Sequence, residues 1–397
     1  MTSRKMLNKV PEITVFFWVI KVLCTTVGET FADNLNENLG LGLTGTSYLM
    51  GGALLIVLAF QFRARRYVPG IYWLAVVLIS VVGTLVSDNL VENYGVTLET
   101  TTIAFSIALV AVFASWYAVE RTLSVHTIFT TRREAFYWLA ILFTFALGTS
   151  AGDFLSEQLE LGYLAALGIF AGAIVVVAVL HFGLRMNAIL SFWLAYILTR
   201  PLGASIGDYL ASPTAEGGLG LGTNLTSIIF LTTILALVVY LAITKRDVIR
   251  SGRLPAAAAV GDGAPAVLVV LNKVEATASL LDAVRKRAAE GTARFVVLVP
   301  NPDHVGFDRN SPPSADGEAL LAQARSQLRE PAGGEVSGRV ANSPNAYDDV
   351  IEELEANPYA EIIVETPPSH ISHWLHVDLP QRIAELGYPT VAVAAAQ

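Results

Sequence analysis

Residues 18–33 read WVIKVLCTTVGETFAD, and three later stretches follow the same pattern: WLAVVLISVVGTLVSD at 73–88, WLAILFTFALGTSAGD at 138–153 and WLAYILTRPLGASIGD at 193–208. In every copy, Trp is followed by nine residues, Gly, four residues and Asp, without a gap. Four copies with one spacing indicate an internal repeat, which fixes the architecture of the region that contains it. The motif residues are Trp18, Gly28 and Asp33; Trp73, Gly83 and Asp88; Trp138, Gly148 and Asp153; and Trp193, Gly203 and Asp208.

Each motif lies in an apolar stretch that is long enough to cross a bilayer, which takes about 20 predominantly apolar residues in a helix. Over the 397 residues, 53% are hydrophobic and only 15% are charged, whereas about a quarter are charged in a typical soluble domain. The sequence therefore predicts a membrane all-α domain over residues 1–245, with four two-helix repeats at about 10–65, 66–125, 130–187 and 188–245. The eight expected spans are 12–33, 44–62, 70–88, 101–119, 135–154, 162–183, 188–209 and 223–244.

Lysine and arginine are distributed unequally between the loops. The alternate loops and the N-terminal segment contain them, whereas four loops contain neither: 34–43, 89–100, 156–163 and 211–222. Because short loops that carry Lys and Arg stay in the cytoplasm, we predict that both termini are cytoplasmic. The expected location is a bacterial inner membrane, with the lipid bilayer as the main environment.

Four tandem units, each with two spans and a characteristic tryptophan, resemble a family of bacterial membrane proteins that is built from four tandem repeats of unknown function. The resemblance covers about residues 10–245. It implies the eight-helix architecture and does not imply an activity.

The motif also predicts how the helices pack. A small residue follows each motif Gly by four positions, so every odd-numbered span has a small-xxx-small face that allows close helix contact. We expect these four parallel spans to form an inner bundle and the even-numbered spans to face lipid. The tryptophans are expected at the headgroup level near the cytoplasmic helix ends, and the aspartates at one depth toward the outer side.

Carboxylates inside a membrane are costly and often functional. The expected cation-binding residues are the four motif aspartates, Asp33, Asp88, Asp153 and Asp208, and Glu29, which follows the motif Gly only in the first repeat. Oxygen-rich acidic clusters suit Mn²⁺, Mg²⁺, Ca²⁺ or protons. The alternative interpretation is that the aspartates only mark helix ends.

Two basic residues also lie inside the predicted spans. Lys21 and Arg200 are interpreted as counter-ions or gating residues that release a carboxylate when a cation arrives. The alternative is a structural one, in which they extend to the membrane surface or neutralise Glu29.

A soluble α/β domain is predicted over residues 266–397, after a linker at 246–265. Short β-branched runs alternate with amphipathic helices there, which is typical of a parallel sheet with helices on both faces. The arrangement resembles the universal stress protein domain. Nucleotide-binding members of that family have a Gly-rich loop after the fourth strand, but Thr366–His370 lacks a Gly-x2-Gly signature, so ATP binding is not expected.

The same loop contains an H-x2-H-x2-H spacing, formed by His370, His373 and His376. Three imidazoles could bind one metal ion if the segment forms a turn. They could equally be three solvated side chains.

The function expected from these features is cation transport, with a divalent metal such as manganese as the substrate and the soluble domain as a regulator. The metal would be a substrate, and no cofactor is expected. Two alternatives stay open: a cation or proton channel around the same carboxylates, and a non-transporting membrane anchor or sensor. An enzyme is not expected, since the G-x-S-x-G, H-E-x-x-H and P-loop motifs are lacking. The expected partner is an inorganic cation and not a nucleic acid, and a homo-oligomer is left open.

Overall fold

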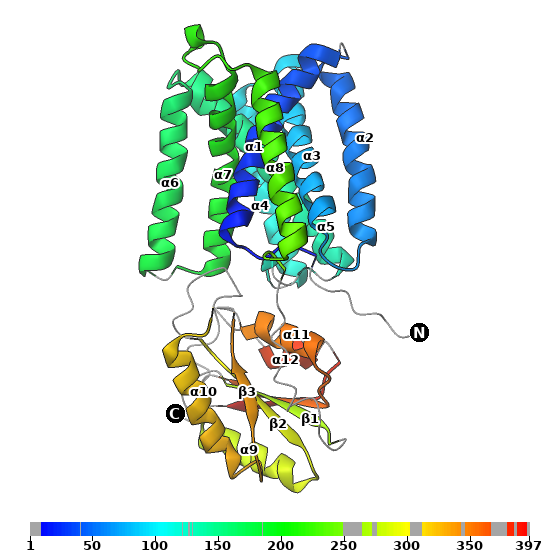
Figure 1. Cartoon of the computed structure of the whole chain (residues 1–397), viewed down its shortest axis with the longest axis vertical. Helices are drawn as coiled ribbons and strands as arrows, with labels where there is room; N and C mark the ends of the chain where they lie inside the picture. The colour runs from blue at the N-terminus through cyan, green and yellow to red at the C-terminus, as the bar shows by residue number, and fades with distance from the viewer. Residues whose placement is uncertain are drawn as a thin grey trace. The chain divides into compact units, whose positions relative to one another are not determined.

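The computed structural model describes residues 9–39, 41–120, 122–125, 128, 130–184, 186–248, 264–271, 276–301, 312–342, 346–366, 379–384 and 387–394. The chain divides into two compact units, residues 1–248 and 249–397. Figure 1 shows that the first unit is a bundle of long helices and that the second contains a sheet flanked by helices.

Eight helices of the first unit are long and apolar enough to cross a membrane, which confirms the eight predicted spans. In the second and third repeats the α-helix ends at the motif Asp, and a π-helical turn follows directly, at Asn89–Asn93 (η1) and Phe154–Gln158 (η3). The spanning helices are α1 Val15–Leu39, α2 Gly42–Arg63, α3 Pro69–Asp88, α4 Leu98–Glu120, α5 Thr131–Asp153, α6 Tyr163–Leu184, α7 Ala188–Ala211 and α8 Thr223–Thr244.

The odd-numbered helices form the interior of this unit. In the most apolar part of each odd-numbered span 56–78% of the residues are buried, against 17–28% in the even-numbered spans. Helix α1 packs on α3, α3 on α5, α5 on α7, and α7 back on α1. We call this closed arrangement the inner ring, and its two ends the Trp end and the Asp end.

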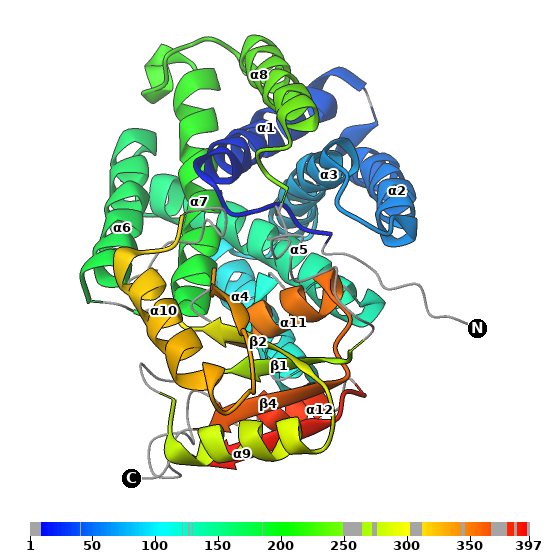
Figure 2. The same cartoon turned by 60° about the horizontal axis from the view of Figure 1, so that its bottom comes forward.

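Each even-numbered helix packs on the inner-ring helix of the next repeat. Helix α2 lies on α3, α4 on α5, α6 on α7, and α8 on α1. In Figure 2, α2, α6 and α8 accordingly lie at the periphery of the bundle. The last repeat thus closes onto the first, as expected for parallel repeats around one axis.

The motif glycines are the points of closest approach in the inner ring. A Cβ on any of them would lie 2.6–2.8 Å from a Cβ atom of the next helix around the ring, which real structures do not tolerate. The residues met by Gly28, Gly83, Gly148 and Gly203 are, in that order, Ser80, Phe145, Arg200 and Thr25. Every contacted residue lies three positions before the motif Gly of its own repeat, so one contact recurs around the ring.

We predict that Gly148→Leu prevents the inner ring from closing, because the added side chain would have to displace Arg200 and Pro201 from α7. The expected result is loss of folded, monodisperse protein after detergent extraction, measured by size-exclusion chromatography. Gly172→Leu on α6 is the matched control, since a Cβ at Gly172 would have no neighbour within 4 Å. Normal yield and thermal stability in Gly148→Leu would contradict the prediction.

Aromatic pairs close the Trp end in the same cyclic order. The aromatic residue before each Trp packs on the Trp of the next repeat, with ring centroids 5.5–6.3 Å apart. The four pairs are Phe17–Trp73, Tyr72–Trp138, Tyr137–Trp193 and Phe192–Trp18. The tryptophans therefore pack between repeats, and their expected position at the headgroup level stays a prediction.

The second unit is a parallel five-stranded sheet in the order β3-β2-β1-β4-β5, which confirms the predicted α/β class. Helices α9 and α10 contribute the core on one face, and α11 and α12 the core on the other. The likeness to universal stress proteins stays a prediction. The elements are β1 Ala266–Val270, α9 Ala278–Ala289, β2 Arg294–Val299, α10 Ala315–Arg329, β3 Ser337–Val340, α11 Ala346–Ala356, β4 Glu361–Thr366, α12 Leu379–Ala384 and β5 Thr390–Ala394.

Candidate functional site

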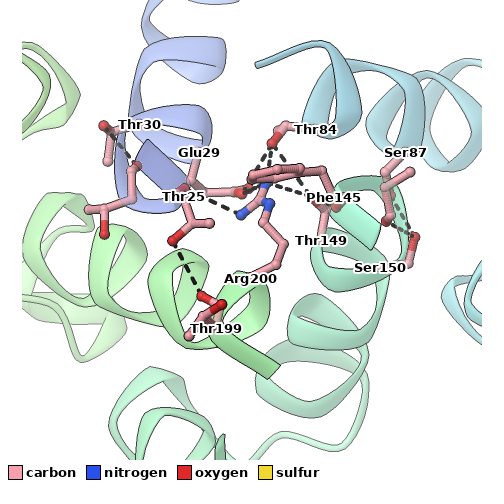
Figure 3. Close-up of polar contacts among 12 residues, drawn as sticks. Thr25, Glu29, Thr30, Thr84, Ser87, Phe145, Thr149, Ser150, Thr199 and Arg200 are labelled. Atoms are coloured by element: carbon pink, nitrogen blue, oxygen red, sulfur yellow. Dashed lines mark hydrogen bonds and ion pairs between the residues drawn. The ribbon is translucent and has the colours of Figure 1, made fainter. Parts of the chain in front are cut away.

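A buried ion pair lies in the interior of the inner ring. Arg200, on α7, is fully buried, and its Nη2 atom lies 2.9 Å from Oε2 of Glu29 on α1. The same nitrogen donates to Oγ1 of Thr149 at 2.7 Å and to Oγ1 of Thr84. Figure 3 shows that the guanidinium joins side chains from all four inner helices. We call Glu29, Thr84, Thr149 and Arg200 the axial cluster.

The repeat explains why these residues meet. Glu29, Thr84 and Thr149 each follow the motif Gly of their repeat directly, and Ala204 holds that position in the fourth. The ring thus brings one repeat position from α1, α3 and α5 to a shared region, while α7 supplies Arg200. Sequence reasoning missed the two threonines as partners of Arg200, although their place after the motif Gly was the available signal.

The motif aspartates lie at the other end of the ring from the aromatic pairs. Asp88 is within electrostatic range of Glu29, Asp153 and Asp33, so acids from three repeats are close to one another. Asp208 holds the equivalent position in α7 and, like the others, is partly buried. Helix α1 continues past Asp33 to Leu39, so this aspartate does not mark a helix end.

The comparison with known families rests on the same four repeats. Residues 16–67, 71–122, 136–187 and 191–247 each match the family described as Repeat of Unknown Function (DUF347). The chain belongs to the DUF347 repeat family. No curated protein matches it. The predicted resemblance to a four-repeat family is therefore confirmed, and the family description supplies no activity.

Lys21 of this DUF347 protein does not pair with Glu29. Its Nζ atom is fully buried and donates to the Tyr196 carbonyl oxygen at 2.8 Å and to Thr199 Oγ1 at 2.5 Å. The ammonium also lies 4.0 Å from the centroid of the Tyr196 ring. Of the two basic residues interpreted as partners that could neutralise Glu29, Arg200 forms the pair and Lys21 does not.

Ready-made metal sites are lacking in the part of the DUF347 chain that the structure describes. There, no three His, Cys, Asp or Glu side chains are grouped so that they could hold a metal ion. His370, His373 and His376 lie outside the described residues, so their proposed metal site stays a prediction.

A second polar network lies beside the Trp end. Lys9 and Glu134 form a buried ion pair of 2.6 Å, and Gln61 donates to the same carboxylate at 3.1 Å. Beyond the end of α8, Tyr67 donates to Oδ2 of Asp247 at 2.5 Å. Burial raises the pKa of the Asp247 carboxyl, and the hydrogen bond from Tyr67 opposes that shift. These contacts tie the N-terminal segment and the chain after α8 to the loops of the bundle.

Proposed function

We propose that the DUF347 repeat domain transports cations across the membrane through the interior of the inner ring. The observation that carries this proposal is the axial cluster, a buried Glu29–Arg200 pair in contact with all four inner helices. Stability alone does not explain this pair, because a buried ion pair is often no more stabilising than well-packed apolar residues of similar size. The buried charges are therefore better explained by a function.

The charges are arranged in an order that suits cation entry from the Asp end. The motif aspartates provide an acidic mouth, and Glu29 lies one helical turn deeper than Asp33, about 6 Å at 1.5 Å per residue. A cation that reaches Glu29 would compete with Arg200 for the same carboxylate. Arg200 then acts as an internal counter-ion that keeps Glu29 neutralised when no cation is bound.

A divalent metal such as Mn²⁺ is the first candidate substrate, because the candidate ligands, Glu29 and the four motif aspartates, are oxygen donors, which favour hard cations. A proton is the second candidate. It is favoured by the lack of a preformed metal-binding group among the described residues, since a proton needs only single carboxylates and hydroxyls.

Cation binding can be tested on the purified full-length protein. A ligand that binds only the folded state raises the unfolding temperature, and the stabilisation grows with the logarithm of ligand concentration over its dissociation constant. We expect one of Mn²⁺, Mg²⁺ and Ca²⁺ to raise the unfolding midpoint of the wild type and not of a variant with Asn in place of all four motif aspartates. Equal shifts of the unfolding midpoint in both proteins would show that the aspartates do not bind the cation. No shift of the midpoint with any metal would contradict a divalent substrate.

We also propose that the Trp end faces the cytoplasm of a bacterial cell, with both termini on that side, because the loops at the Asp end contain no Lys or Arg. Reporters fused after Arg66 and Arg253 should then be cytoplasmic, and reporters fused after Glu92 and Glu216 external. The opposite labelling at either pair would reverse the direction of entry.

The C-terminal α/β unit is proposed to regulate transport. In support, the segment that leads from α8 toward it is anchored at the Trp end, where the backbone oxygen of Asp247 accepts from the Glu12 N–H at 2.8 Å. Removal of residues 249–397 should change the transport rate while leaving cation binding intact. An unchanged rate would leave this unit without a regulatory role.

A further inference from the structure

Lys21 is a buried ammonium that the Glu29–Arg200 pair leaves without a carboxylate. Its two hydrogen-bond acceptors, the Tyr196 carbonyl and the Thr199 hydroxyl, are both neutral. No described carboxylate oxygen lies within ion-pair distance of its Nζ atom. Burial without a counter-ion disfavours the charged form of an amine, so such a group loses its proton more readily than one in water.

A second positive charge lies close to Lys21. Lys21 Nζ lies 5.3 Å from the centroid of the Phe145 ring, and Arg200 Cζ lies 5.6 Å from the same centroid. Arg200 also directly follows Thr199, whose hydroxyl accepts from Lys21 Nζ, and the charge of Arg200 is offset by Glu29. A cation that took Glu29 from Arg200 would leave two uncompensated positive charges beside one ring.

The other titratable groups around Lys21 do not supply a negative charge. Its own helix carries Cys24 one turn away, and α7 contributes Tyr196 and Arg200. Helices α3 and α5 contribute Tyr72 and Tyr137 at the Trp end, where their hydroxyl oxygens lie 2.5 Å apart. The nearest described carboxylate along α1 toward its C-terminus is Glu29, two turns away, and it is paired with Arg200.

We propose that Lys21 is the proton-carrying residue that couples cation transport to proton movement in the opposite direction. This inference rests on the proposed cation transport. When the cation occupies Glu29, the Lys21 ammonium releases one proton to water and keeps a neutral amine, which can still donate to Tyr196 and Thr199. When the cation leaves, Arg200 returns to Glu29 and Lys21 takes up a proton from water on the other side. Cation and proton therefore occupy the ring in turn.

The test uses full-length protein in proteoliposomes that contain a pH-sensitive dye. A pH gradient, with equal Mn²⁺ on both sides, should drive Mn²⁺ accumulation by the wild type, and an imposed Mn²⁺ gradient should move protons the other way. Lys21→Met, which carries no charge to release, should retain Mn²⁺ movement down its own gradient and lose at least about tenfold of the pH-driven accumulation, whereas Lys21→Arg, whose charge cannot be released, should lose both. Arg cannot lose its proton in a protein. The Lys21→Arg variant therefore distinguishes a role of Lys21 in proton transfer from a role that needs only a positive charge.

The outcomes are distinguishable. No Mn²⁺ movement in the wild type under either gradient would overturn the proposed divalent-metal transport itself. Mn²⁺ movement without countermovement of protons would leave transport standing and overturn the role of Lys21. Restored coupling in Lys21→Arg would show that Lys21 supplies only a charge, and it would also overturn the inference. If Lys21→Met fails to fold, the Lys21→Arg variant and the proton measurement on the wild type still test whether Lys21 carries the coupled proton.

Discussion

Arg200→Met is expected to lower the free energy of unfolding of the transmembrane unit by about 3–5 kcal/mol, because it leaves the Glu29 carboxylate buried without its partner. Thr84 and Thr149 would lose the same nitrogen as a hydrogen-bond donor. Methionine keeps much of the length of the arginine side chain, so the effect should come from the lost charge and not from a large cavity. Thermal or denaturant unfolding of the purified protein in one detergent measures the change.

The double variant Glu29→Gln/Arg200→Met provides the control. Removing both charges eliminates the uncompensated carboxylate, so most of the stability lost in Arg200→Met should return. Two residues in contact are expected to show such coupling in a double-mutant cycle. Strictly additive losses from the two single changes would mean that Glu29 and Arg200 do not interact in the membrane.

Loss of cation flux in Glu29→Gln is the second large effect that we expect, at about tenfold or more. Glutamine keeps the size and much of the hydrogen bonding of Glu29 but cannot offer a charge to a cation or carry a proton. Single Asp→Asn changes at Asp33, Asp88, Asp153 and Asp208 should have smaller effects, because three carboxylates would remain at the mouth. Flux into proteoliposomes, normalised to the amount of folded protein, measures all five variants.

Glu99→Gln is the matched control for this series. Glu99 is an exposed carboxylate in the first turn of α4, outside the inner ring, so its replacement should leave flux within a factor of about two of the wild type. If Glu29→Gln also stays in that range, the axial cluster does not lie on the cation route.

Much of the architecture follows from local sequence properties. The eight spans were predictable because each one must be long and apolar, and the strands of the α/β unit because short β-branched runs alternate with amphipathic helices. The spacing of Trp, Gly and Asp also predicted the inner position of the odd-numbered helices, since small residues at one helix face indicate close packing.

The partners within the inner ring could not be derived in the same way. Lys21 and Arg200 were equivalent candidates for Glu29 in the sequence, and Lys21 is nearer along the chain. The choice of Arg200 depends on the cyclic order of the helices, which brings α7 against α1 across the whole repeat domain. Three repeats contribute the residue after the motif Gly to one guanidinium, which is a property of helix rotation and not of spacing alone.

The packing of the even-numbered helices was also not predicted in detail. Their apolar composition indicates a lipid-facing position but does not say which neighbour they choose. In the structure each one lies on the inner helix of the following repeat. The π-helical turns after Asp88 and Asp153 likewise have no clear sequence signal, although such turns often lie at functional sites.

Cation uptake by the wild-type protein is the most direct test of the central claim that the inner ring is a cation route. Purified protein in proteoliposomes should be exposed to an inward gradient of each candidate cation under a negative internal potential, with internal metal and pH recorded in parallel. We predict uptake of at least one cation, or of protons, clearly above that of empty liposomes, and its loss in Glu29→Gln. Folded wild-type protein that moves neither metal ions nor protons above the empty-liposome level would contradict this account.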